Sequence, residues 1–264
     1  MDITGTLVAA GVIGGVGILV GVLLGRASKV FRVEENETEK AVRAALPSNN
    51  CGACGYPGCD GLAKAIAAGE APTNACPVGG APIAAKIAEI MGGGSEQPAE
   101  VQVAFVHCKG DCEKAKDVYN YVGPKICGTA VNSPNGGPKA CRYGCLGYGE
   151  CMSACKFGAI SLSDGIAVVD PEKCVSCGKC VAACPRGIIS LVPKEKKHHI
   201  ACNSKDKGLD VKKACAVGCL ACTMCVKQCP EGAIEMQGNL PKIDYSKCVN
   251  CGVCAAKCPA KSIS

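Results

Sequence analysis

The chain has 264 residues, a formal net charge of +6 and 25 Cys, but no Trp, only 3 Phe and 6 Tyr. Large aromatic side chains normally dominate burial in a protein core, so this composition excludes a core built mainly on them. At such a Cys density, the remaining stabilising links are disulfides or metal sites.

An apolar run without charge occupies residues 7–24. With its neighbours it reaches about 20 residues, which spans a bilayer at about 1.5 Å per residue. A cleaved signal peptide is the alternative, but it needs positive charge before the run, where only Asp2 is charged. Arg26, Lys29 and Arg32 come after the run, and the positive-inside rule places the rest of the chain in the cytoplasm. We therefore expect a single-pass anchor in the inner (cytoplasmic) membrane.

That orientation bears on the cysteines. Cytoplasmic thiols are kept reduced, so 25 Cys on that side are expected to be metal ligands rather than disulfides. Sites rich in thiolate favour iron–sulfur clusters or zinc.

Short helices are expected after the anchor. A charged segment over residues 34–46 predicts the first, and two more are predicted at about 60–68 and 81–91, with Asp60 as a helix N-cap. The Gly-rich residues 92–100 indicate a flexible linker.

An internal repeat comes after the linker. When residues 141–184 are shifted by 74 positions, eight Cys coincide with eight Cys without a gap. The first set is Cys141, Cys145, Cys151, Cys155, Cys174, Cys177, Cys180 and Cys184, and the second is Cys215, Cys219, Cys225, Cys229, Cys248, Cys251, Cys254 and Cys258. Agreement of this kind indicates a duplicated module.

Three cysteine runs have the spacing C-x2-C-x2-C-x3-C before Pro, beginning at Cys174, Cys219 and Cys248. In such ferredoxin runs three thiolates bind one cubane and the fourth binds the neighbouring one. Zinc sites instead use two separated C-x2-C pairs. The spacing therefore predicts three crossed ligand sets: Cys155, Cys174, Cys177 and Cys180; Cys219, Cys222, Cys225 and Cys258; Cys229, Cys248, Cys251 and Cys254.

The remaining run of the first module departs from the pattern. Tyr148 stands where the second module has Cys222, and Lys156 replaces the usual Pro. One interpretation gives this cluster the ligands Cys141, Cys145, Cys151 and Cys184. The competing interpretation builds a sixth cluster from Cys108, Cys112, Cys127 and Cys141. The site of Cys145, Cys151 and Cys184 then lacks one thiolate, unless His107 supplies the missing ligand. Cys202 and Cys215 nearly repeat the spacing of Cys127 and Cys141. They are interpreted as spare structural thiols, with vestigial ligands as the alternative.

The segment before the linker has a pattern of its own, with four Cys in a Gly-rich loop and after a helix. We expect Cys51, Cys54, Cys59 and Cys76 to bind one 4Fe-4S cluster, with zinc as the alternative. The whole chain then holds at least five clusters, or six with the set that includes Cys108.

The predicted fold class is α+β, made of small modules that clusters stabilise. We expect an N-terminal transmembrane helix, a helical 4Fe-4S domain and two tandem ferredoxin-like 2[4Fe-4S] modules. The corresponding ranges are 1–28 for the anchor, 29–92 for the helical domain, 93–138 for a linker with the Cys108, Cys112 and Cys127 segment, 139–193 for the first module and 194–264 for the connector and second module.

The segment CGACGYPGCDGLAKAIAAGEAPTNACPVGG, between an N-terminal apolar helix and ferredoxin runs, resembles the B subunit of the Rnf complex. That family is the ion-translocating ferredoxin:NAD oxidoreductase of bacterial membranes, and two ferredoxin modules resemble its longer form. The resemblance implies a translocase subunit that takes electrons from reduced soluble ferredoxin. It relays them to membrane subunits that couple transfer to sodium or proton export. It also implies that Cys51, Cys54, Cys59 and Cys76 bind the membrane-proximal cluster.

No complete active site is expected on this chain alone, and no nucleic-acid partner. No G-x-G-x-x-G motif follows a strand, so flavin and NAD are expected on other subunits. The connector is rich in lysine: Lys194, Lys196, Lys197, Lys205, Lys207, Lys212 and Lys213. This positive charge could steer an acidic ferredoxin to the second module. The alternative is a solvated linker, which would have the same composition. Two other functions fit the motifs: a membrane-tethered polyferredoxin for a hydrogenase or another reductase, and a zinc-stabilised interaction protein.

Overall fold

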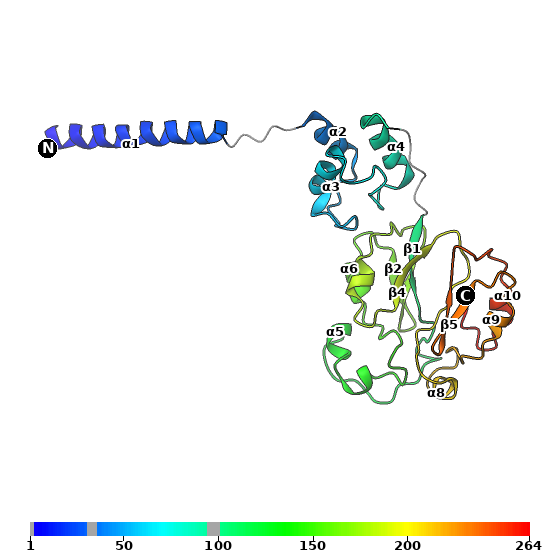
Figure 1. Ribbon diagram of the computed structural model, residues 1–264. Helices are drawn as coiled ribbons and strands as arrows, with labels where there is room; N and C mark the ends of the chain where they lie inside the picture. Colours follow the sequence, from blue (N-terminus) through cyan, green and yellow to red (C-terminus); the bar gives the residue numbers. More distant parts are fainter. Residues whose placement is uncertain (1–2, 31–35, 94–100) are drawn as a thin grey trace.

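The computed structural model describes residues 3–30, 36–93 and 101–264 (Figure 1). Helix α1 extends over Ile3–Val30 and contains the apolar run. Among the described ranges, no helix combines the length and hydropathy that a membrane span requires. The expected anchor therefore stays a prediction, and Arg32, one of the basic residues used to orient it, lies outside the described residues.

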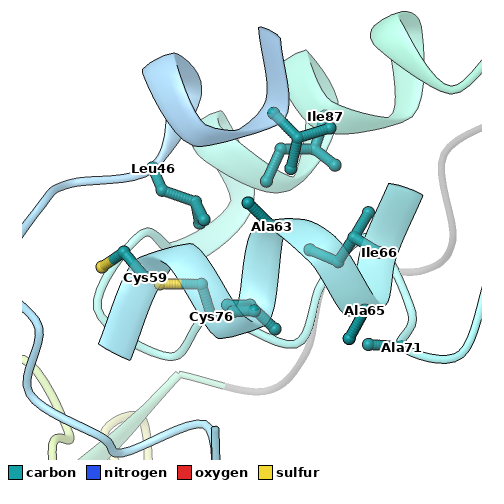
Figure 2. Close-up of a cluster of buried hydrophobic side chains, with 10 residues drawn as sticks. Leu46, Cys59, Ala63, Ala65, Ile66, Ala71, Cys76 and Ile87 are labelled. Carbon is teal, nitrogen blue, oxygen red and sulfur yellow. The ribbon is translucent and has the colours of Figure 1, made fainter. Parts of the chain in front are cut away.

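Three helices form the first unit: α2 (Glu37–Ala45), α3 (Gly58–Ala67) and α4 (Gly80–Ile90). Leu62 and Ile66 of α3 and Ile87 of α4 are at most 1% exposed and form its core, which Figure 2 shows around α3. The three predicted helices are confirmed, and the ends of α3 and α4 differ from the predicted ones by at most two residues. Residues 34 and 35, with which the first helix was predicted to begin, lie outside the described residues.

The predicted cap of α3 is wrong. The cap position is Pro57, which has no side-chain cap bond. Asp60 lies in the first turn and accepts a hydrogen bond from Arg43 Nε at 2.5 Å, which ties α3 to α2. A side-chain cap is present on the neighbouring helix α2, where Asn36 Oδ1 accepts the Thr38 N–H at 3.0 Å.

The C-terminal part, residues 101–264, consists of short helices and strands. In chain order its elements are β1 (Gln102–Val106), α5 (Cys127–Ala130), the 3-10 helix η1 (Pro134–Gly136), α6 (Glu150–Ala154), β2 (Ile160–Ser163), β3 (Ile166–Val169), α7 (Lys179–Ala183), β4 (Ile189–Pro193), α8 (Gly208–Ala214), α9 (Met224–Lys227), β5 (Ile234–Gln237), β6 (Leu240–Ile243) and α10 (Val253–Ala256). Helices and strands of this kind agree with the mixed α and β class that the sequence predicts.

Three antiparallel pairs of strands organise this part: β1 with β4, β2 with β3 and β5 with β6. The pairs β2–β3 and β5–β6 are two-residue hairpins at equivalent places of the repeat, with Asp164 and Gly165 in the first turn and Gly238 and Asn239 in the second. Gly165 and Gly238 have positive φ, as such tight turns require.

Both segments expected as linkers take part in these modules. Residues 102–106, within the predicted linker 93–138, form β1 and pair with β4 of the first module. In the connector, Ile200 forms a bridge with Ile263 at the C-terminal end of the second module. Each module is therefore closed by a segment that precedes its cysteine runs; residues 94–100 of the expected linker lie outside the described part.

Candidate metal centres

The candidate sites are numbered 1–5: site 1 in the first unit, sites 2 and 3 in the first module and sites 4 and 5 in the second. Two cavities of the second module are each lined by four cysteines drawn from both of its runs. Site 4 is lined by Cys219, Cys222, Cys225 and Cys258. Site 5 is lined by Cys229, Cys248, Cys251 and Cys254. The fourth cysteine of each site comes from the run that supplies three cysteines to the other. The structure thus brings together the two crossed sets that the spacing predicts.

A third cavity, site 2, gathers the crossed set predicted for the first module, which is Cys155, Cys174, Cys177 and Cys180. Burial, followed by the nearby Cys174 and Cys177, raises the pKa of the Cys180 thiol to about 11. The same causes, burial and then Cys219, raise the pKa of Cys225 in site 4 to about 11. These thiols therefore share a dry, crowded environment that disfavours a free thiolate.

The fourth cavity differs from the expected ligand set. Site 3 is lined by Cys127, Cys145, Cys151 and Cys184. Cys141, which was expected here, lines a different cavity together with Cys108. Burial, and then Cys145 and Cys184, raises the pKa of Cys151 to about 12, and Cys127 adds to this rise.

The irregular run contacts the chain segment that carries Cys127. The ring of Tyr148 packs near that of Tyr121, with centroids 5.8 Å apart. Cys127 begins helix α5, and the next residue, Gly128, donates its N–H to Glu150 Oε2 at 2.6 Å. Burial raises the pKa of Cys127, and hydrogen bonds from the backbone of Glu150 and Tyr148 oppose that rise. Glu150 thus fixes the Cys127 segment beside the irregular run.

Two other proposed ligands of the irregular region lie elsewhere. Cys112 is exposed and lines none of the cavities described for sites 2–5. Both ring nitrogens of His107 already have partners, since Nδ1 lies 2.7 Å from the Ile200 oxygen and Nε2 lies 2.6 Å from Ser190 Oγ. Within the described ranges, no three His, Cys, Asp or Glu side chains converge on a position for one metal ion.

Site 1 belongs to the first unit. Cys54, Cys59 and Cys76 belong to the same packed cluster, and Figure 2 shows Cys59 and Cys76 at its edge. Burial raises the pKa of Cys76, and the nearby Cys54 and Cys59 raise it further. Asn50 holds the loop, because its Oδ1 accepts the Cys59 N–H at 2.8 Å. Cys51, the fourth expected ligand, is half-buried in the preceding loop.

The loops of sites 2–5 share one backbone conformation. In each run, two residues with positive φ flank the position of the second cysteine. This position is Cys177, Cys222 or Cys251, and in the irregular run it is Tyr148. These residues are Ser176 and Gly178, Ala221 and Thr223, Asn250 and Gly252, and Gly147 and Gly149. The irregular run therefore keeps the ferredoxin loop although its middle cysteine is missing.

Comparisons with known proteins agree with this geometry. Residues 46–78 match the family described as "Putative Fe-S cluster", residues 167–190 a 4Fe-4S binding domain and residues 218–262 a 4Fe-4S dicluster domain. The matches place iron–sulfur domains in the first unit and in both modules.

Three relatives align with nearly the whole chain. One is the B subunit of the Na(+)-translocating ferredoxin:NAD(+) oxidoreductase complex of Acetobacterium woodii, 48% identical over 98% of this chain and 77% of its own length. The B subunit of the ion-translocating oxidoreductase complex of Methanosarcina acetivorans is 44% identical over 96% and 95%. The B subunit of the proton-translocating ferredoxin:NAD(+) oxidoreductase complex of Clostridium ljungdahlii is 45% identical over 94% and 88%. The chain belongs to the family of B subunits of the ion-translocating oxidoreductase (Rnf) complexes.

Proposed function

We propose that this chain is the electron-relay subunit of an ion-translocating ferredoxin:NAD oxidoreductase, with one 4Fe-4S cluster at each of sites 1–5. The observation that carries this proposal is that four cysteines, three from one run and one from another, line each of the cavities at sites 2, 4 and 5. Such clusters accept and release single electrons, at potentials set by charge, hydrogen bonds and exposure.

The residues at these sites suit such a group. Each of sites 2–5 offers four thiols in a mostly apolar cavity, and burial raises the pKa of a thiol such as Cys151 to about 12, so it is neutral on its own. Coordination to a metal deprotonates a thiol, so iron would supply the charge that burial otherwise disfavours. At site 3 we assign the ligands Cys127, Cys145, Cys151 and Cys184, and at site 1 Cys51, Cys54, Cys59 and Cys76.

The connector lysines support reduced ferredoxin as the electron donor. Lys194 is paired with Glu172 at 2.9 Å, and Lys196 donates to the Cys248 backbone oxygen at 2.5 Å, beside site 5. Five others are exposed, of which Lys213 lies 3.8 Å from Asp210; they are Lys197, Lys205, Lys207, Lys212 and Lys213. Positive charge this close to sites 4 and 5 would speed the approach of an acidic protein and make electron entry near the second module efficient.

This function is tested by the rate at which reduced ferredoxin bleaches the visible absorbance of the anaerobic chain. The double variant Lys205→Glu and Lys207→Glu is expected to be reduced roughly 10-fold more slowly at low salt. The matched variant Lys64→Glu and Lys86→Glu, which changes the charge of the first unit equally, is expected to keep the original rate. A chain that reduced ferredoxin does not bleach, or two variants slowed equally, would contradict the donor assignment.

We also propose that α1 anchors the chain in the inner membrane beside the polytopic subunits, with the cluster domains in the cytoplasm. The uncharged run 7–24 and the basic residues Arg26 and Lys29 support this topology. Membranes washed with alkaline carbonate are expected to retain the chain. The double variant Val16→Arg and Val20→Arg should be released, since each Arg costs about 2.5–3.5 kcal/mol at the centre of a bilayer. Release of the unaltered chain would overturn the anchor.

A further inference from the structure

Sites 1–5 use 20 of the 25 cysteines, which leaves five for which the ferredoxin pattern has no place. Four of these five line one cavity: Cys108, Cys141, Cys202 and Cys215. The space in this junction cavity, including its opening to solvent, is about 390 Å³, and on the same measure the cavities of sites 2–5 have about 330–390 Å³. By size and by number of thiols, the junction cavity matches the cluster sites around it.

The two modules contribute equivalent cysteines to this cavity. Cys141 and Cys215 coincide under the 74-residue shift that relates the modules. Cys108 and Cys202 are equivalent by hydrogen bonding, because Cys145 N–H donates to Cys108 Sγ at 3.3 Å and Cys219 N–H donates to Cys202 Sγ at 3.3 Å. Cys145 and Cys219 are themselves related by the same shift.

The segments that precede Cys108 and Cys202 are equivalent as well. The N–H of His107 donates to the Ile188 oxygen at 2.7 Å, and the N–H of Ala201 donates to the Ser262 oxygen at 2.8 Å. Ile188 and Ser262 are again 74 residues apart. The first module therefore contributes Cys108, which follows its closing segment, and Cys141. The second module contributes the equivalent Cys202 and Cys215.

Contacts across the junction bring the four sulfurs together. Ala115 forms a β-bridge with Cys215. A Cβ built on Gly110 would lie 3.1 Å from Cys215 Sγ and 3.9 Å from Cys108 Sγ, so both sulfurs face this glycine. Burial raises the pKa of Cys141, and the nearby Cys108 and Cys215 raise it further. Burial likewise raises the pKa of Cys202 to about 11, with a contribution from Cys141.

A buried cation also lines the junction cavity. Lys139 is 6% exposed, and its ammonium group donates to the backbone oxygens of Gly110 at 2.9 Å and Gly165 at 3.3 Å. Burying a charge is costly unless an opposite charge lies close by. Four thiolates around iron would provide that opposite charge.

We propose that Cys108, Cys141, Cys202 and Cys215 bind a sixth 4Fe-4S cluster, which joins the two ferredoxin-like modules. This inference rests on the proposed electron-relay function and extends it. The ligand set contains two thiolates from each module, so the cluster also fastens the modules to each other.

The placement gives the relay a continuous order. Cys145, a ligand of site 3, hydrogen-bonds to Cys108, and Cys219, a ligand of site 4, hydrogen-bonds to Cys202. One hydrogen bond thus joins the junction site to a ligand residue of site 3, and another joins it to a ligand residue of site 4. Clusters held by these three ligand sets would let single electrons pass between site 4, the junction site and site 3. Each transfer would oxidise the donor cluster by one electron and reduce the acceptor by one, without proton transfer or bond cleavage.

The test is the iron content per chain of the full-length protein, purified without oxygen. We expect about 24 iron atoms for the unaltered chain, about 20 for Cys141→Ser and for Cys202→Ser, and about 24 for the control Cys112→Ser, with four irons per cluster. Cys112 is the matched control because it is the fifth remaining cysteine and is exposed.

Several outcomes would overturn the inference. An unaltered chain with about 20 irons has no junction cluster, and this count decides the question even where a variant fails to fold. A Cys112→Ser chain that loses four irons, or a Cys202→Ser chain that loses none, contradicts this ligand set. An unaltered chain with almost no iron refutes the proposed electron relay as well, so the two failures are distinguishable.

Discussion

The double variant Cys127→Ser and Cys141→Ser is expected to lose about eight iron atoms per chain, twice the loss of about four expected for each single variant. The structure places Cys127 at site 3 and Cys141 at the junction cavity, so the two substitutions remove ligands from different clusters. Effects at independent sites add, whereas effects within one site do not.

The measurement is iron and acid-labile sulfide per chain in the unaltered protein, the two single variants and the double variant. A matched pair within one site is Cys145→Ser with Cys151→Ser, for which the double variant is expected to lose no more than either single one. If the Cys127 and Cys141 substitutions together remove only about four irons, both cysteines serve one cluster and the assignment of site 3 is wrong.

Gly147→Ala is expected to remove the cluster at site 3, with a loss of about four irons per chain. Gly147 has φ +76°, and a Cβ at this position would lie 2.3 Å from the Gly165 oxygen in the turn between β2 and β3. Positive φ alone is tolerated, because Ala221 occupies the equivalent position of the second module with φ +53°. The collision with the backbone of Gly165 therefore decides the outcome, since it pushes the loop that carries Cys145 away from site 3.

The control for this prediction is Gly178→Ala. Gly178 has a similar φ of +69°, but a Cβ there has no atom within 4 Å. We expect only the conformational cost of the left-handed region, about 1–2 kcal/mol, and an unchanged iron content. Equal iron contents in the Gly147→Ala and Gly178→Ala variants would show that the contact with Gly165 does not shape site 3.

Much of the cluster machinery is predictable from spacing. The C-x2-C-x2-C-x3-C-P runs impose both the loop and the exchange of the fourth cysteine, so the groupings at sites 2, 4 and 5 in the structure are those that the sequence predicts. The helices of the first unit are predictable as well, because Leu62, Ile66 and Ile87 follow helical periodicity and bury one face.

Site 3 could not be assigned from local spacing. Its fourth cysteine, Cys127, comes from a segment with no counterpart in the second module, where Cys222 holds the corresponding place within the run. Only the folded chain shows that the bond between Gly128 N–H and Glu150 Oε2 brings Cys127 to the run that contains Tyr148. From the sequence, Cys141 was the expected fourth ligand of this site.

The junction cavity collects its cysteines from four separate segments, so no single motif reveals it. A signal was nevertheless present. Cys141 and Cys215 coincide under the repeat, and Cys108 and Cys202 each follow a short apolar stretch that closes a module. Cys108 lies further from Cys141 than Cys202 lies from Cys215. A comparison of the two modules without gaps therefore does not align Cys108 with Cys202.

The central claim is that thiolates of this chain hold iron and inorganic sulfide at successive sites. The most direct measurement is the content of iron, zinc and acid-labile sulfide in protein purified without oxygen. We predict iron and sulfide in equal amounts, at about 20 or more atoms of each per chain, because a 4Fe-4S cluster contains four of each. A colourless protein that contains zinc, or no metal, and no acid-labile sulfide would contradict the account.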